Sequence, residues 1–453
     1  MIRWPEADAA CVSLLRQLGA AAVWLPLEAP GEPSPFLDAC RRAGIRVIAE
    51  LGAADTAKLA EARRAGFAGA TFKAAGDERQ IRKLASEQSG WELFVYLKPE
   101  QIHWRVEPAR PVLLAGLWPG SRRSDPTLAG ASQAVWLDAN SYLVAYLRGL
   151  FPDRDALLGY RPDEDAGIAK DQRVPYNSVE LALAEAAAAG GNFVLTLPEH
   201  YRQALLKGET RAQTAWNALV QTARFLNQYA ETFRRPSAAR VAVAAWSLED
   251  CAEILNLLYR NNVSPAVVGA NRIPAPGRFQ ILVTVGMGSY PDGVDRALEF
   301  ARAGGKVLAV PASGDEKPWW ATAARRTRSE EGRDIYSLGK GIIIAYREPV
   351  SDPGEFALDV IDVMGWRTRD LRIWGAGAVI GLLHRHDGGR LSIELLNYGG
   401  FERDFLVRVE QRFRQASLRT PQAPPLPLRA AQRGSGTEIE VPGVNRVASL
   451  LLE

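Results

Sequence analysis

The sequence predicts a multidomain α/β protein: a (β/α)8 barrel, then a smaller α/β layer domain, then a small antiparallel β-sandwich. Three observations predict this order. Short apolar runs alternate with helical stretches up to residue 235, a second α/β series follows, and the helical period disappears after residue 366. Strand–helix alternation is typical of parallel sheets with crossover helices, whereas apolar–polar alternation is typical of antiparallel strands. We therefore predict domains over 1–235, 236–366 and 367–453.

The composition is that of an ordinary folded chain. The 453 residues are 47% hydrophobic and 24% charged, enough for two to four domains of about 150 residues each. A formal net charge of +3 provides no basic face, so a nucleic-acid partner is not expected. Three cysteines exclude a disulfide framework and a thiolate zinc site, and no apolar run reaches the roughly 18 residues of a membrane span.

We expect no metal and no cofactor, because the four histidines are not joined by convergent carboxylates or cysteines. No signal-peptide pattern opens the chain. A cytoplasmic location and export after removal of a leader both stay open.

Nine apolar runs compete for the eight strand positions of the barrel. They cover residues 2–4, 22–27, 46–51, 70–73, 93–98, 112–118, 134–138, 157–160 and 193–198. Either the run at 2–4 lies outside the barrel, or only one of the runs at 93–98 and 112–118 is a barrel strand. A count from Ala22 makes 93–98 the fourth strand, whereas a count from Ile2 makes it 70–73. We favour the first count, because it places carboxylates at the ends of the fourth and seventh strands.

The two remaining domains are predicted from shorter patterns. In the middle domain the expected strands are 241–245, 266–268, 281–285, 306–310 and 342–346, and residues 319–331 look polar and irregular. The C-terminal strands are 378–386, 390–398, 405–413, 437–441 and 447–452, with a hairpin signal at Asp387-Gly388-Gly389. Alternating segments separated by turn residues are typical of a β-sandwich.

Four motifs, together with the order of the domains, carry a family resemblance. They are residues 138–142 (DANSY), 158–163 (LGYRPD), 180–197 and 395–398 (LLNY). The chain resembles glycoside hydrolases of the three-domain β-galactosidase type. The resemblance implies a flavodoxin-like or class I amidotransferase-like middle domain, a carbohydrate ligand, and a homo-oligomer formed through that domain. No cysteine follows strand 281–285, so the middle domain lacks the nucleophile for glutamine hydrolysis.

The resemblance has one departure that concerns catalysis. Barrels of this clan usually carry an Asn-Glu pair at the end of strand 4 and a glutamate at the end of strand 7. This chain contains no Asn-Glu dipeptide. The acid/base position of the family is therefore not marked by its usual motif.

The candidate catalytic residues are carboxylates at the C-terminal ends of the barrel strands, where active sites of such barrels lie. Glycoside cleavage needs two of them. In the count from Ala22, Glu100 falls near the acid/base position and Asp163 near the nucleophile, with Asp138 as a third candidate. Asp138 precedes a helix, so capping is its alternative role. In the count from Ile2, strand 4 ends in Lys73 and the paired-carboxylate mechanism is lost.

The candidate substrate-binding residues also stand at or just beyond strand ends. They are Glu50, Lys98, Trp118, Asn140, Tyr160, Arg161 and Glu199. Trp118 precedes Pro119-Gly120, which favours a ring exposed to a sugar, whereas Trp24 is expected to fill the core. Lys73 or Lys98 would form a buried ion pair with Glu50 as an alternative to a catalytic role.

Three functions stay open. The first is hydrolysis of a glycosidic bond by paired carboxylates. The second is a catalytically degenerate barrel that binds carbohydrate or organises an assembly, and the third is a lyase or aldolase-type barrel that uses Lys73 or Lys98. Two carboxylates about 5 to 9.5 Å apart would favour hydrolysis.

Overall fold

The structure is a computed structural model that describes residues 1–28, 31, 33–53, 56–74, 76–88, 90–119, 139–160, 173–313, 316–399 and 403–453. Its contacts divide the chain into two compact units. The first consists of Met1–Asn140 and Asp153–Ala230, and the second of Ser141–Pro152 and Glu231–Glu453. The three-domain division with boundaries after residues 235 and 366 stays a prediction.

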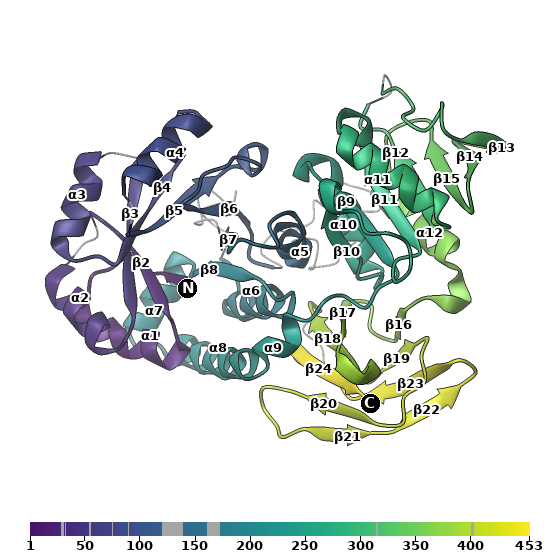
Figure 1. The fold of residues 1–453 in the computed structure, drawn as a ribbon. Helices are drawn as coiled ribbons and strands as arrows, with labels where there is room; N and C mark the ends of the chain where they lie inside the picture. The colour runs from purple at the N-terminus through teal and green to yellow at the C-terminus, as the bar shows by residue number, and fades with distance from the viewer. Residues whose placement is uncertain are drawn as a thin grey trace. The chain divides into compact units, whose positions relative to one another are not determined.

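The first unit holds a closed barrel of eight parallel strands (Figure 1). The strands are β1 (Ile2–Arg3), β2 (Ala22–Pro26), β3 (Arg46–Ala53), β4 (Gly69–Lys73), β5 (Glu92–Leu97), β6 (Arg110–Gly116), β7 (Leu157–Tyr160) and β8 (Asn192–Thr196). The ring closes through β1, where Ile2 pairs with Val23 on one side and with Leu195 on the other. The predicted barrel is therefore confirmed.

The favoured strand count, which starts from Ala22, is wrong. The run at 2–4 contains β1, and the runs at 93–98 and 112–118 overlap β5 and β6, so all three belong to the barrel. Strand 4 is consequently Gly69–Lys73, which ends in a lysine, while Leu157–Tyr160 stays strand 7. The count from Ala22 was favoured for the carboxylates that it placed at strand ends, and a β1 of only two residues provided no pattern against it. The run at 134–138 lies outside the described residues.

Helices surround the barrel strands (Figure 1). They are α1 (Val12–Leu18), α2 (Pro33–Arg42), α3 (Thr56–Ala65), α4 (Glu78–Glu87), α6 (Tyr176–Ala188), α7 (Glu199–Leu206) and α8 (Thr210–Gln228). Helix α9 (Ala230–Phe233) begins at the last residue of the first unit and continues into the second. Asp77 caps α4, because its Oδ1 accepts a hydrogen bond from the Gln80 backbone N–H at 2.8 Å. Inside the barrel, the Trp24 and Phe94 rings pack with centroids 4.9 Å apart, so Trp24 fills the core as predicted.

The second unit contains a seven-stranded sheet with the order β10-β9-β11-β12-β15-β14-β13. The strands are β9 (Val241–Ala245), β10 (Ala266–Gly269), β11 (Ile281–Val285), β12 (Lys306–Val310), β13 (Arg325–Glu330), β14 (Arg333–Leu338) and β15 (Gly341–Tyr346). The first five in this order are parallel, and they follow the 2-1-3-4-5 succession of flavodoxin-like sheets. The amidotransferase likeness of this region stays a prediction.

The hairpin of β13 and β14 corrects the expectation that residues 319–331 are irregular. Strand β13 lies at the edge of the sheet and its side chains are exposed, apart from partly buried Glu330. A strand without a buried face has no apolar alternation, which is why the sequence pattern missed it. Its charged side chains also disfavour pairing with the edge of another sheet.

Four helices accompany this sheet in the second unit: α5 (Ser141–Leu150), α10 (Leu248–Arg260), α11 (Pro291–Arg302) and α12 (Pro353–Met364). Helix α5 stands between β6 and β7 in the sequence, yet it packs against β10 and α10. The approach to β10 is close: a Cβ atom added to Gly149 would lie 2.6 Å from the carbonyl oxygen of Val267. Only glycine permits this distance without a shift of the backbone.

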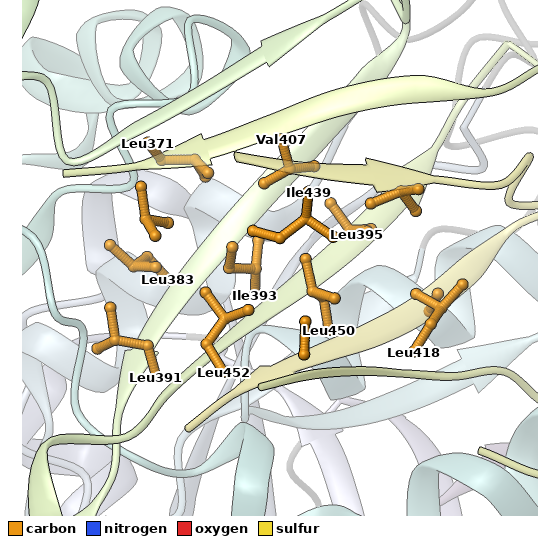
Figure 2. Close-up of a cluster of buried hydrophobic side chains, with 14 of the residues drawn as sticks. Leu371, Leu383, Leu391, Ile393, Leu395, Val407, Leu418, Ile439, Leu450 and Leu452 are labelled. Carbon is orange, nitrogen blue, oxygen red and sulfur yellow. The ribbon is translucent and has the colours of Figure 1, made fainter. Parts of the chain in front are cut away.

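Two antiparallel sheets form the predicted β-sandwich. The four-stranded sheet consists of β16 (Leu371–Trp374), β19 (Phe405–Val409), β23 (Gly436–Val441) and β22 (Ala430–Arg433). The five-stranded sheet consists of β17 (Val379–Arg385), β18 (Leu391–Asn397), β24 (Val447–Leu452), β20 (Ala416–Arg419) and β21 (Leu426–Leu428). Figure 2 shows the shared core, in which Val407 and Ile439 meet Ile393 and Leu450. The predicted hairpin is present, with Gly388 and Gly389 at φ 72° and 79°.

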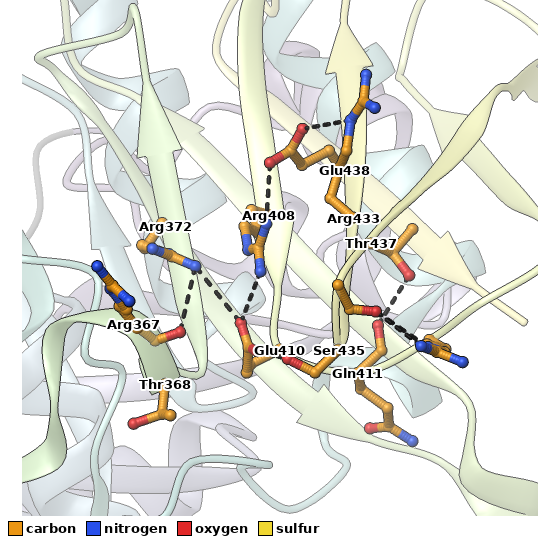
Figure 3. A network of polar contacts seen from close by, with 12 residues as sticks. Arg367, Thr368, Arg372, Arg408, Glu410, Gln411, Arg433, Ser435, Thr437 and Glu438 are labelled. Carbon is orange, nitrogen blue, oxygen red and sulfur yellow. Dashed lines mark hydrogen bonds and ion pairs between the residues drawn. The ribbon is translucent and has the colours of Figure 1, made fainter.

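A network of charged side chains links the strands of the four-stranded sheet (Figure 3). Arg372 and Arg408 stand directly opposite each other across β16 and β19. Glu410 accepts from both guanidinium groups, at 3.4 and 3.2 Å. Burial would raise the pKa of Glu410, but hydrogen bonds from Ser435 and Arg408 outweigh it and lower that pKa. The carboxylate thereby offsets the repulsion between two like charges.

Candidate functional site

Two adjoining cavities lie at the C-terminal ends of the barrel strands. The first has a volume of about 340 Å³ and is lined from β1, β2, β3, β4, β5, β6 and β7. The second has a volume of about 430 Å³ and lies beside the end of β5. Lys73, Tyr96 and Leu114 line both. This is the face on which barrel enzymes place their sites, and we call the two cavities the barrel mouth.

Glu50 is the most enclosed carboxylate among the described residues of the barrel mouth. It stands near the end of β3, and 16% of its side chain is exposed. The Arg3 Nε donates to its Oε2 at 2.6 Å, and the Tyr96 hydroxyl donates to its Oε1 at 2.9 Å. Burial, followed by the charge of Glu50, raises the pKa of Tyr96 well above its usual range. The phenol therefore stays protonated, and both partners hold Glu50 in one orientation.

The pairing of Glu50 corrects one prediction. Neither Lys73 nor Lys98 forms the expected ion pair with it, because Arg3 occupies that role. Lys98 instead lies 3.9 Å from Glu100. Lys73 is exposed at the end of β4. Lys73 stands on β4, the strand next to β3, but its side chain is exposed at the strand end, whereas Arg3 reaches Glu50 from β1, two strands away in the ring.

Glu100 lies in a different place from the one predicted. It belongs to the short 3-10 helix η2 (Pro99–Gln101), which follows strand 5 rather than strand 4. Its side chain is 65% exposed and lines the second cavity. A role for Glu100 as the acid/base residue stays a prediction, but the strand-4 argument for it is wrong.

Trp118 and Asn140 are both buried, so the expectation of an exposed Trp118 ring is wrong, whereas substrate binding by either residue stays a prediction. Trp118 is fully buried, and its indole N–H donates to the carbonyl oxygen of Thr196 at 2.9 Å. The Asn140 side chain accepts from the Leu117 backbone N–H at 2.8 Å and donates to the Leu117 carbonyl at 2.7 Å. Its backbone N–H donates to Glu185 of α6 at 2.7 Å. Asn140 thus ties the chain that follows β6 to helix α6.

Tyr160 contributes only its ring to the barrel mouth. It lines the first cavity, but its hydroxyl donates to the carbonyl oxygen of Ala182 at 2.8 Å. Burial raises the pKa of Tyr160 well above its usual range. The hydroxyl is therefore held inside the protein as a donor, and a ligand would meet the aromatic surface.

The remaining predicted residues are Glu199, Asp138, Asp163 and Arg161. Glu199 is exposed at the first position of α7 and lines neither cavity. Asp138, Asp163 and Arg161 lie outside the described residues. Sequence reasoning missed Arg3 and Tyr96. The signal for Arg3 was the count from Ile2, which places it at a strand end.

The described ranges hold neither a metal-binding cluster nor a membrane-spanning helix. They contain no group of three or more His, Cys, Asp or Glu residues arranged to hold a metal ion. In those ranges, no helix combines the length and apolarity that crossing a bilayer requires.

Solved glycoside hydrolases share the fold of this chain over most of its length. An α-L-fucosidase, isoenzyme 2 from Paenibacillus thiaminolyticus, matches with a TM-score of 0.66 and 10% identity, covering 100% of this chain and 99% of its own. A β-galactosidase from Rahnella sp. R3 matches with a TM-score of 0.60 and 11% identity, covering 97% and 98%. An exo-β-1,4-mannosidase from Opitutaceae bacterium strain TAV5 matches with a TM-score of 0.52 and 12% identity, covering 81% and 95%.

In fold, therefore, the chain is a glycoside hydrolase-like (β/α)8 barrel protein with antiparallel β sheets in its C-terminal region. No family model matches the sequence, and no curated protein matches it. At sequence identities of 10 to 12%, the similarity to these structures defines the fold. The chemistry of the site depends on the residues of this chain.

Proposed function

We propose that this chain binds a carbohydrate in the barrel mouth, around Glu50. The observation that carries the proposal is the pairing of Glu50 with Arg3 and Tyr96 at the edge of a cavity of about 340 Å³. A carboxylate held by two donors keeps lone pairs for the hydroxyl groups of a ligand. The rings of Tyr96 and Tyr160 line the same cavity, and such rings pack against the C–H faces of sugars. The named activities of the structural neighbours support a sugar as the ligand class.

Binding is favoured over hydrolysis by the chemistry at the end of strand 4. Lys73 stands there, so this strand end lacks the carboxylic acid that protonates the leaving oxygen in the paired-carboxylate mechanism. The other described carboxylates of the mouth, Glu28 and Glu100, are 82% and 65% exposed, and each lies beside a lysine. The described mouth therefore offers one enclosed carboxylate, whereas cleavage needs two that act together.

Hydrolysis of a glycosidic bond is the second candidate function. It is favoured by the position of Asp163, which follows β7 in the sequence, the strand that carries a catalytic glutamate in the resembled family. In this proposal Asp163 acts with Glu50 or Glu100, and Asp138 is the remaining alternative. The lysine-dependent lyase has no comparable support, because an amine nucleophile is activated by burial and Lys73 is exposed.

The binding proposal is tested by calorimetric titration of the whole chain with a panel of oligosaccharides. We expect saturable binding of at least one sugar, weakened about tenfold or more in Glu50→Gln, the equivalent of one good hydrogen bond to a charged group. Glu87→Gln is the matched control, because Glu87 lies on α4 outside both cavities. Equal affinities in both variants, or no binding to any sugar, would contradict the proposal.

Hydrolysis is tested in parallel with a panel of chromogenic aryl glycosides. Turnover by the wild type that disappears in Asp163→Asn and Glu50→Gln, with melting temperatures unchanged, would establish the second candidate. Binding without turnover would leave a carbohydrate-binding barrel. Turnover that survives both substitutions would place the chemistry on other residues.

A further inference from the structure

We propose that the carbohydrate is acidic: a sugar that carries an oxyanion, either a uronic-acid carboxylate or a sulfate ester, which Lys73 and Arg3 bind. This inference rests on the proposed function and names its substrate class. Its basis is the charge of the barrel mouth. The described side chains that line the two cavities include four cationic groups, Arg3, Lys58, Lys73 and Lys98, against three carboxylates, Glu28, Glu50 and Glu100.

Each of the three carboxylates already has a cation beside it. Glu50 is paired with Arg3 at 2.6 Å, Glu28 with Lys58 at 2.8 Å, and Glu100 with Lys98 at 3.9 Å. Lys73 is the cation left over. Over the described part of the chain, no carboxylate forms an ion pair with its ammonium group.

The position of Lys73 makes this excess charge relevant to a ligand. It lines both cavities, so a group bound to its ammonium would be within reach of sugar rings in either one. Tyr96 and Leu114, which also line both cavities, provide an aromatic and an aliphatic surface there. An anion at this point would meet a positive charge next to a low-dielectric wall, where charge–charge attraction is stronger than in open water.

Arg3 provides further donors in the same cavity. Its Nε is used by Glu50, whereas no acceptor among the described residues bonds to its two terminal nitrogens. The side chain is only 22% exposed, so these N–H groups are partly removed from water. A planar guanidinium with free terminal nitrogens matches the paired oxygens of a carboxylate or sulfate. The hydroxyl groups of neutral sugars can accept from these donors, but they carry no negative charge and therefore form weaker bonds to the fork and the ammonium than an oxyanion does.

The test compares acidic oligosaccharides with chemically matched neutral ones. Calorimetric titrations of the whole chain use trisaccharides of galacturonate, glucuronate and mannuronate, each beside its carboxyl-reduced form, and a sulfated galactan trisaccharide beside its desulfated form. At low ionic strength we expect one acidic ligand to bind about tenfold more tightly than its neutral partner. Added salt should narrow the difference, because an exposed ammonium is screened. The uronate and sulfate series separate the two sources of the oxyanion.

Two variants test whether Lys73 is responsible for the preference for acidic over neutral sugars. Lys73→Met removes the ammonium and keeps an apolar chain of similar length, and it should lower the acidic-to-neutral ratio from about tenfold to less than about threefold. Lys83→Met is the matched control, because Lys83 lies on α4 and lines neither cavity; it should leave the ratio unchanged.

The possible outcomes distinguish a failure of this inference from a failure of the carbohydrate-binding proposal on which it rests. Equal affinity for acidic and neutral sugars would overturn the inference while the carbohydrate-binding function stands. A preference that survives Lys73→Met would also overturn it, since the oxyanion would then be bound elsewhere. Failure to bind any sugar, acidic or neutral, would overturn the proposed function and the inference together.

Discussion

Glu394→Gln is expected to abolish a loss of stability that the wild type undergoes as pH rises to neutral and alkaline values. Glu394 lies on β18, opposite Ser449 of β24, and its side chain is fully buried. Burial raises the pKa of this carboxyl from 4.5 to about 7, although the hydroxyls of Ser392 and Ser449 act in the opposite direction. The folded protein therefore holds this proton at pH values where the unfolded chain has released it.

The sign and size of the effect follow from this difference in proton binding. Below about pH 4.5 the carboxyl is protonated in both states and has no effect on stability. Between the unfolded pKa and about 7, the unfolded chain binds fewer protons, so the free energy of unfolding falls as pH rises. Above about pH 7 the loss is complete, and at about 1.4 kcal/mol for each pKa unit it amounts to about 3 kcal/mol. A glutamine does not ionise, so the variant should lack this decline.

Urea unfolding from pH 4 to pH 8.5 measures the effect, with hydrogen exchange of peptides from β18 and β24 to locate it. Relative to its own value at low pH, Glu394→Gln should gain about 3 kcal/mol over the wild type at pH 8. Any constant cost of burying the amide cancels in this comparison. Glu440→Gln, at an exposed position of the same sandwich, should follow the wild-type profile. Parallel profiles for the wild type and Glu394→Gln would refute the reasoning.

Gly149→Ala should lower the free energy of unfolding by about 1 to 3 kcal/mol, because the added methyl group would meet the carbonyl of Val267. Gly277→Ala is the control: Gly277 has open space around it, so this substitution should have little effect on the melting temperature. Asn140→Ala should cost about 2 to 3 kcal/mol in urea unfolding, because it removes the side-chain hydrogen bond to buried Glu185 and the two side-chain bonds to the Leu117 backbone. A loss below about 0.5 kcal/mol would contradict the structural role. From the family resemblance we expect a homo-oligomer formed through the middle domain, and a monomeric mass in light scattering would remove that expectation.

The sequence predicted the barrel and the sandwich because each has a strong local pattern. Strand β1 was difficult because two residues carry no periodicity, and leaving it out shifted the number of each strand up to β6, whereas Leu157–Tyr160 is strand 7 in both counts. The Glu50–Arg3 pair joins residues 47 positions apart. It forms because β1 closes the ring, and no local sequence pattern predicts such a contact. Trp118 was expected at the surface because of the turn that follows it. Its indole N–H instead has a partner in Thr196, 78 positions away.

Helix α5 makes the order of synthesis relevant to how this chain folds. It is made before β7 and β8, but its packing partners β10 and α10 are made about a hundred residues later. Until they emerge from the ribosome, α5, whose buried residues include Leu143 and Leu147, lacks these packing partners. Contacts of such sequence separation form slowly, and exposed apolar segments of nascent chains are sites of aggregation. A cut after residue 235 would therefore remove α5 from the second unit and leave β10 without its helix.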